Sequence, residues 1–233
     1  MAPSLPRGWA SDTAALYARV CRRGAALALG NWPVGLVVVL YAALLGLVML
    51  VAAPLGLVGG LLAYLAVVAC ASSWLSLVAQ VIGAGRVRLH DLPGSFRAYF
   101  GDLLTVGFLL WGLRLLASLV LAPFPFLQIV FVLATFVFLN AVPELVYLGR
   151  HAPAELLVES YRFIGENWIE WFPANLALLA VVLGTFTLVP LGVPADALVG
   201  ILLYFGMIVR GLLFLELATS GRRAREFRRR SVG

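Results

Sequence analysis

The sequence predicts an all-α membrane protein with six transmembrane helices, arranged as three repeated helical hairpins. Of the 233 residues, 63% are hydrophobic and only 12% are charged, whereas soluble globular proteins carry about 25% charged residues. The apolar runs are long enough to cross a hydrocarbon core about 30 Å thick, which takes about 20 helical residues. We therefore expect a single membrane domain, residues 1–233, and exclude a soluble fold.

Two kinds of turn alternate between the apolar runs. The outer turns are nearly uncharged and centred on Pro54, Pro123 and Pro190, and the basic inner ends are Gly85-Arg86, Gly149-Arg150 and Gly221-Arg222. Each inner glycine is expected to end a helix in the left-handed conformation. The predicted spans are residues 34–53, 57–82, 103–122, 124–147, 172–189 and 198–217.

The arginines predict the topology. All 17 basic residues are arginine, and all but Arg114 and Arg210 lie in the N-terminal segment, the inner connections and the C-terminal tail. The outer turns carry one charged residue, Asp196. Because short loops rich in Lys and Arg stay in the cytoplasm, both termini are expected there, in a multi-pass protein of the bacterial inner membrane.

The hairpin is repeated at a nearly constant interval. The outer prolines are separated by 69 and 67 residues, which predicts repeats over residues 11–86, 90–150 and 153–222, followed by a basic tail, 222–233. A mixed segment precedes the first helix of each hairpin. Residues 153–165 have the pattern of an amphipathic helix, which favours a helix at the cytoplasmic interface; a linker helix facing the cytoplasm is the alternative. Trp32, Trp168 and Trp171 are expected to be interfacial anchors.

Polar side chains recur near the inner end of the second helix in each hairpin. Gln80, Glu144 and Glu216 each lie five residues before the inner glycine, about 7.5 Å along the helix axis. Arg210 and Asn140 are expected close to this depth, with Glu144 and Glu216 as acidic partners of Arg210. These five residues are candidates for a polar collar near the cytoplasmic side.

Polar residues also mark where the first helix of each hairpin begins, at Asn31, Asp102 and Asn167. They are expected to lie beside the collar. Arg114 is predicted near mid-membrane, where charged residues generally face the protein interior or water and find partners. Two interpretations stay open: an ion, proton or substrate path closed by an Arg–Glu pair, or polar contacts that fix helix packing, each contributing about 1 kcal/mol.

Other chemistry has little support in the sequence. His90 and His151 stand singly, so no metal site and no cofactor are predicted. Ser72 and Ser73 have no histidine or lysine at a matching depth to act as a base. We therefore expect a protein without catalytic residues.

The C-terminal tail is expected to contact lipid. Near a membrane surface each arginine contributes about 1 kcal/mol to binding of anionic lipid; a role in topology alone is the alternative. No nucleic-acid-reading module is present, so nucleic acid is not an expected partner. The candidate headgroup ligands are Arg222, Arg223, Arg225, Arg228, Arg229 and Arg230.

One stretch of the chain resembles a known family. Pro143-Glu144, Glu159-Ser160-Tyr161 and Gly165-Glu166-Asn167-Trp168 are similar to segments of poorly characterised bacterial six-span membrane proteins, among them the membrane domain attached to some glycerophosphodiester phosphodiesterases. The resemblance implies a fold. It transfers no catalytic residue, because the soluble phosphodiesterase domain has no counterpart in this sequence.

These observations support a ranked set of functions. The first is a non-enzymatic accessory, assembly or lipid-interacting protein of the inner membrane, with anionic lipids, a membrane-protein partner or a second copy of the chain as partners. The second is a small permease or channel subunit that uses the polar collar. An intramembrane lipid enzyme comes third, because it needs a water-accessible acid or nucleophile.

Overall fold

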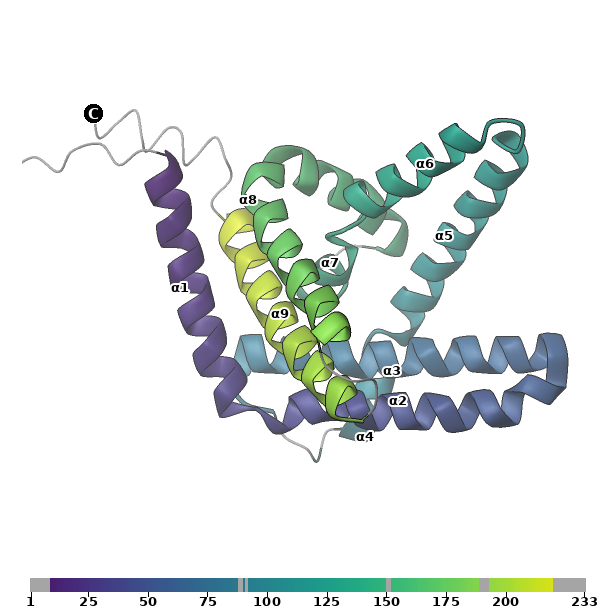
Figure 1. Cartoon of the computed structure of the whole chain (residues 1–233), viewed down its shortest axis with the longest axis horizontal. Coiled ribbons are helices and arrows are strands. Elements are labelled where there is room, and N and C mark those ends of the chain that lie inside the picture. The colour runs from purple at the N-terminus through teal and green to yellow at the C-terminus, as the bar shows by residue number, and fades with distance from the viewer. Residues whose placement is uncertain (1–8, 88–89, 91, 150–151, 189–192, 220–233) are drawn as a thin grey trace, which may run out of the picture.

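The computed structural model describes residues 9–87, 90, 92–149, 152–188 and 193–219, and the ordered elements among them are helices. Figure 1 shows them in chain order. They are α1 (Trp9–Gly30), α2 (Pro33–Ala52), η1 (Ala53–Leu55), α3 (Gly56–Ala84), α4 (Leu92–Ala98), α5 (Phe100–Val120), α6 (Pro125–Phe138), α7 (Val142–Leu148), α8 (Pro153–Leu188) and α9 (Val193–Thr219).

Five of the described helical stretches are long and apolar enough to cross a membrane. They confirm the prediction of an all-α, multi-pass membrane protein. The longest, Pro33–Ala84, contains α2, η1 and α3, and Figure 1 shows α2 and α3 folded back side by side. Pro54 lies within the short 3-10 helix of this turn, and Gly56 follows with φ of +56°, a conformation that glycine adopts without steric cost.

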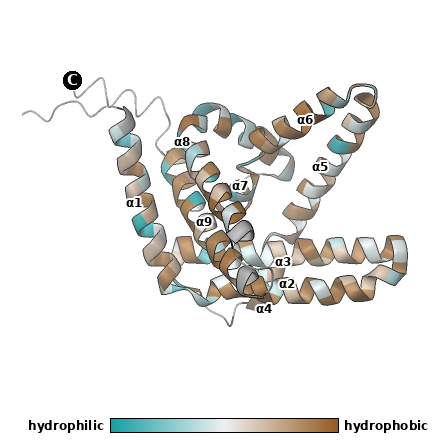
Figure 2. Cartoon of the chain, in the orientation of Figure 1, coloured by the Kyte–Doolittle hydropathy of each residue, from teal (hydrophilic) through white to brown (hydrophobic). Residues whose placement is uncertain are grey.

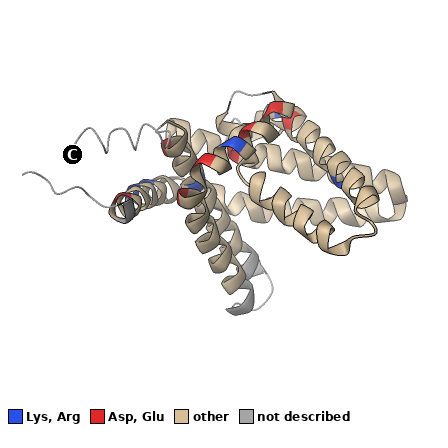
Figure 3. Ribbon diagram, turned by 90° about the horizontal axis from the view of Figure 1, so that it is seen from above, with Lys and Arg blue, Asp and Glu red and all other residues tan. Residues whose placement is uncertain are grey.

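Three helical hairpins, α2–α3, α5–α6 and α8–α9, extend from a shared region that we call the base. The base contains α4, α7 and the parts of the longer helices nearest to them. The outer part of each hairpin is called an arm. Figure 1 shows the α2–α3 and α5–α6 arms diverging from each other, and Figure 3 shows the α8–α9 arm leaving the base in a different direction from both. The structure thus has three diverging arms joined at one end.

The hydrophobic core lies in the base. Leu77, Val81, Ala141, Ile208 and Leu213 have no exposed surface, and they belong to a single cluster of buried side chains. The arms are almost entirely apolar yet exposed (Figure 2). Apolar side chains exposed over half their surface include Leu50, Leu57, Leu116, Phe126 and Leu183. Exposure of this much apolar surface to water is unfavourable, so the arms require lipid or protein around them.

Small residues allow close contact between α2 and α9. A Cβ atom added to Gly200 would lie 3.2 Å from the carbonyl oxygen of Gly35, and one added to Gly35 would lie 3.3 Å from the Tyr204 ring. Glycines at helix crossings let the two backbones approach in this way. The contact joins the beginning of the α2–α3 hairpin to the beginning of α9.

Two predicted segments differ in internal structure. The predicted span 124–147 agrees in its bounds with the apolar stretch Pro125–Leu148, but this stretch is divided into α6 and α7. The predicted amphipathic segment 153–165 is the first part of α8, a continuous helix of 36 residues. Of the inner glycines, Gly85 ends α3 with φ of +73° as predicted, whereas Gly149 ends α7 with an extended backbone. Gly221 lies outside the described residues.

Candidate functional site

The break between α6 and α7 leaves backbone carbonyl oxygens in the base without partners in their own helix. Pro143 lies in the first turn of α7 and has no N–H to continue the hydrogen-bond ladder from α6. The amide of Val142 donates to the carbonyl oxygen of Leu139 at 3.2 Å rather than to that of Phe138, and the carbonyl oxygen of Phe138 accepts a hydrogen bond from the Ser160 hydroxyl at 2.8 Å. The carbonyl oxygen of Asn140 accepts one from Nη2 of Arg210 at 2.7 Å. The break therefore creates acceptors for two other helices.

Arg210 of α9 binds Glu144 of α7 at two points. Nε of Arg210 donates to Oε1 of Glu144 at 2.7 Å, and Nη2 donates to Oε2 at 2.9 Å. The Glu144 side chain has no exposed surface and that of Arg210 is 14% exposed. This bidentate geometry suits the planar guanidinium group, which matches both carboxylate oxygens at once.

The remaining partners of Arg210 come from α8 and from the α6–α7 break. Nη1 of Arg210 donates to Oδ1 of Asn175, and the guanidinium carbon lies 5.1 Å from the centre of the Trp171 ring. Nε1 of Trp171 in turn donates to Oδ1 of Asn140 at 2.9 Å. We call Arg210, Glu144, Asn140, Asn175 and Trp171 the Arg210 cluster. It joins α7, α8 and α9 to the end of α6.

The Arg210 cluster holds equal and opposite charges that satisfy each other. Both carboxylate oxygens of Glu144 accept hydrogen bonds, and each nitrogen of the guanidinium group donates at least one. A buried ion pair is tolerated in an apolar protein only when its members are paired and hydrogen-bonded in this way. The arrangement fixes the positions of the helices that carry it.

Asn31 forms a second polar contact in the base. Its side-chain nitrogen donates to the carbonyl oxygens of Leu27 at 3.0 Å and Gly85 at 2.9 Å, and its side-chain oxygen accepts from the amide of Val87 at 3.1 Å. The Tyr204 hydroxyl donates to the Asn31 carbonyl oxygen at 3.2 Å. Asn31 thereby connects the α1–α2 turn to the end of α3 and to α9.

A chain of hydroxyl groups links α2, α3 and α4. The hydroxyls of Tyr41 and Ser73 lie 2.5 Å apart, as do those of Ser73 and Ser95. Ser72 accepts from the Tyr99 amide at 2.9 Å. Ser72 and Ser73 are both buried. Ser73 belongs to the chain of hydroxyls, whereas Ser72 bonds to backbone groups and donates to the carbonyl oxygen of Ser95 at 3.3 Å. Their contacts are those of packing residues.

Helix α1 is attached to α8 through Tyr17. Its hydroxyl donates to the carbonyl oxygen of Glu170 at 2.6 Å, and burial, together with the nearby Glu170 charge, raises the pKa of the Tyr17 phenol. Oε2 of Glu170 is buried without a hydrogen-bond partner among the described residues.

The structure divides the predicted collar into separate sites. Arg210, Glu144 and Asn140 come together as predicted. Glu216 instead lines a groove with arginines of α1, and Gln80 is half-buried on α3. The side chains of these residues point in different directions from their helix axes. The number of residues between a side chain and the inner glycine does not determine which neighbouring helix it faces. A closed polar collar is therefore not formed.

The other candidate residues also lie apart from the Arg210 cluster. Asn167 is buried and donates to the carbonyl oxygen of Phe163 at 3.0 Å, and Asp102 is half-buried in the first turn of α5. Arg114 is exposed on the α5–α6 arm, where the surrounding surface is apolar, so it does not face the protein interior as predicted. The tail arginines, Arg222 to Arg230, lie outside the described residues.

Two members of the Arg210 cluster were missed or misassigned from the sequence. Asn175 is not among the predicted site residues, although a lone polar residue in an apolar stretch of α8 indicates a buried polar contact. Trp171 was expected to be an interfacial anchor, yet it is fully buried. Trp32 and Trp168 are more than half exposed, as anchors are.

No protein-family model, curated protein or solved structure matches this chain. The resemblance to membrane domains attached to glycerophosphodiester phosphodiesterases therefore stays a prediction. Among the described residues, no group of three His, Cys, Asp or Glu side chains is arranged to hold a metal ion.

Proposed function

We propose that the chain is a non-enzymatic protein that crosses the bacterial inner membrane six times, with both termini in the cytoplasm, and acts as an accessory, assembly or lipid-interacting protein. The count of six follows if α2 and α3, with 20 and 29 residues, each cross the bilayer, since about 20 residues suffice. The arginine distribution supports the orientation.

The observation that carries this proposal is the contrast between the base and the arms. Charged residues lie mainly in the base and on α1, and the arms are nearly free of them (Figure 3). The charged pair in the Arg210 cluster is satisfied internally, so it stabilises the base and offers little to a solute. The exposed apolar arms are left as the surface that meets lipid or a membrane-protein partner.

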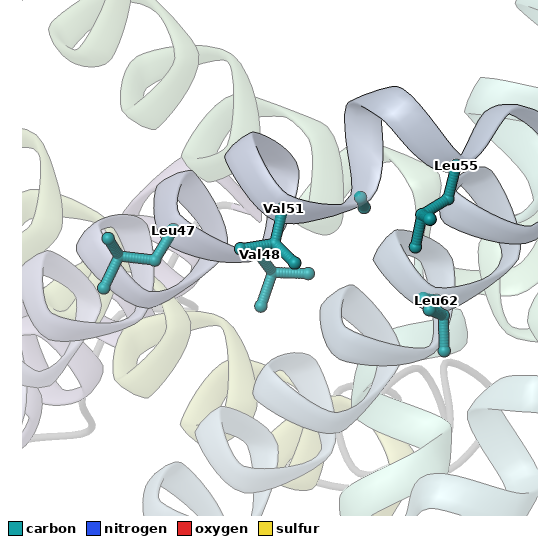
Figure 4. Close-up of a pocket in the computed structure, with 6 residues that line it drawn as sticks. Leu47, Val48, Val51, Leu55 and Leu62 are labelled. Atoms are coloured by element: carbon teal, nitrogen blue, oxygen red, sulfur yellow. The ribbon is translucent and has the colours of Figure 1, made fainter.

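A hollow at the tip of the α2–α3 arm supports a lipid- or partner-binding role. It measures about 290 Å³, and Figure 4 shows its lining residues. They are all apolar: Leu47, Val48, Val51, Ala52, Leu55 and Leu62. A hollow without polar groups suits an acyl chain or an apolar side chain, whereas a polar substrate needs hydrogen-bonding groups to fix it.

Native mass spectrometry of the protein, extracted gently from its own membranes, tests the proposal. The expected result is a chain that retains a stoichiometric protein partner, phospholipid, or both. A chain that retains neither, but accelerates turnover of a labelled membrane lipid extract, would contradict the proposal and establish an enzyme.

A small permease or channel subunit is the second candidate. The bond between Arg210 and Glu144 favours it, because charged residues within membrane spans often belong to solute paths. In that case Glu144→Gln abolishes solute flux in proteoliposomes while the protein keeps the thermal stability of the wild type. A purely structural role predicts loss of stability instead.

A further inference from the structure

A groove between α1 and α9 combines three arginines with an apolar floor. It measures about 680 Å³ and lies at the C-terminal end of α9. Arg19, Arg22 and Arg23 line its α1 side, and their spacing of three and four residues places them on one helix face. All three are exposed. The groove thus concentrates positive charge at the end of a helix that is long and apolar enough to span a membrane.

The floor of the groove is apolar. Val20 and Leu212 lie beneath it, at 3% and 2% exposed, and the apolar surface that the groove presents comes from the half-buried Leu215 and the exposed Ala26. The close contact of α1 and α9 that forms this floor depends on Gly24, where an added Cβ would lie 2.9 Å from a methyl group of Val209. A soluble anion would leave this apolar surface uncovered, whereas an acyl chain would cover it.

We infer that this groove binds an anionic phospholipid, with the phosphate between Arg19, Arg22 and Arg23 and an acyl chain along Ala26 and Leu215. The inference rests on the proposed function, because it requires the C-terminal end of α9 to lie at the cytoplasmic surface of the membrane. Guanidinium groups bind phosphate oxygens through paired hydrogen bonds, and basic pockets beside membrane helices select lipids with anionic headgroups.

Glu216 gives the groove a further testable property. It is the acidic member of the lining residues and opposes binding of an anion. The three arginines offer more hydrogen-bond donors than a single phosphate can accept, and a diphosphatidylglycerol lipid carries two phosphates. We therefore expect diphosphatidylglycerol to bind more tightly than phosphatidylglycerol, and Glu216→Gln to strengthen the binding of both.

The test is titration of the purified full-length chain with defined lipids, followed by native mass spectrometry. The triple variant Arg19→Gln/Arg22→Gln/Arg23→Gln is compared with Arg86→Gln/Arg97→Gln/Arg162→Gln, which removes the same charge from exposed positions outside the groove. Each arginine near a membrane surface contributes about fivefold to lipid binding, so the groove variant is expected to bind diphosphatidylglycerol about a hundredfold more weakly. The control variant is expected to bind it almost as well as the wild type.

Several outcomes would overturn the inference. Equal loss in both triple variants would show that only overall charge matters. Equal binding of phosphatidylcholine would show that the phosphate charge is not recognised, and displacement of the lipid by millimolar inorganic phosphate would assign the groove to a soluble anion. A wild-type chain that binds no lipid of any class would contradict the lipid-interacting role itself, whereas lipid binding that the groove variant keeps unchanged contradicts only the assigned location.

Discussion

Arg210 and Glu144 form a two-point contact between α9 and α7, with N···O distances of 2.7 and 2.9 Å. They are 66 residues apart in the sequence and belong to different hairpins of the predicted repeat. Their contact depends on the α6–α7 break, which positions Glu144 and also gives Arg210 the Asn140 carbonyl oxygen. The charged pair and the helix break therefore stabilise each other.

We expect removal of either charge to destabilise the base. Glu144→Gln leaves the Arg210 guanidinium group buried without a counter-ion. Arg210→Gln leaves the Glu144 carboxylate buried without one. Breaking a buried pair in this way costs about 3–5 kcal/mol. Thermal unfolding of the detergent-solubilised protein measures the effect.

The exposed pair Arg162–Glu159 is the matched control. Its N···O distance is 2.7 Å, as in the buried pair, but the arginine side chain is 62% exposed. Arg162→Gln is expected to cost about 1 kcal/mol or less. If both arginine variants lost the same stability, burial would not explain the role of Arg210.

Alanine substitutions at two adjacent glycines near the α2–α3 turn are expected to have different effects on stability. A Cβ atom at Gly59 would lie 1.8 Å from the Ala52 carbonyl oxygen, whereas nothing lies within 4 Å of one at Gly60. Gly59→Ala must separate the helices and is expected to cost about 1–3 kcal/mol. Gly60→Ala is expected to be neutral or to stabilise the helix by up to about 1 kcal/mol. Equal melting temperatures for the two variants would disprove the close contact.

We expect Asn31→Ala to lower the free energy of unfolding more than Tyr204→Phe does. Asn31→Ala removes the side-chain bonds to Leu27, Gly85 and Val87 and leaves partly buried backbone groups without these partners, each costing about 1 kcal/mol or more. Tyr204→Phe removes one hydrogen bond, worth about 1 kcal/mol. Hydrogen exchange at Val87 provides the local measurement, since its amide donates to Asn31. Slow exchange retained in Asn31→Ala would contradict this assignment.

The diverging arms predict a change of shape in a bilayer. A flat bilayer has one normal, so arms that point in different directions cannot all cross its full thickness. The α5–α6 arm joins the base at Tyr99 and at residues 139–141, outside regular helix, and we expect the arm to change its direction at these joints. Spin labels at Val51 and Val120, exposed at 69% and 70%, are expected to approach each other on transfer from detergent to bilayer.

That experiment uses a Cys21→Ser/Cys70→Ala background, because both cysteines are free. Labels at the exposed residues Arg97 and Arg162, on α4 and α8, serve as the control and should keep their separation. An unchanged distance between the two arms would show that they diverge within the bilayer as well.

Much of the architecture could be predicted from the sequence, because membrane spans and their turns depend on local composition. Apolar runs of sufficient length identify the hairpins, and the turn at Pro54 and the left-handed Gly85 lie where they were expected. Glu144 and Glu216 were both predicted as acidic partners of Arg210, because few charges occur within the apolar runs and a buried charge needs a partner. The structure pairs Arg210 with Glu144.

The contacts that surround this pair depend on information that spacing does not contain. Glu216 shares the sequence position of Glu144 within its repeat, yet it faces α1, because the rotation of each helix about its axis is set by packing. Trp171 was assigned to the interface from its place at the start of a span, and its burial follows from the long, continuous α8. Pro143 was a readable signal for the α6–α7 break that the apolar pattern obscured.

A double-mutant cycle at Arg210 and Glu144, followed by thermal unfolding, tests most directly the claim that the Arg210 cluster is structural. Replacement of a buried ion pair by apolar residues of similar size is often neutral or stabilising. We expect Arg210→Met and Glu144→Leu each to unfold at lower temperature than the wild type, and Arg210→Met/Glu144→Leu to recover most of that loss. Single variants as stable as the wild type, or a double variant no more stable than the weaker single, would contradict it.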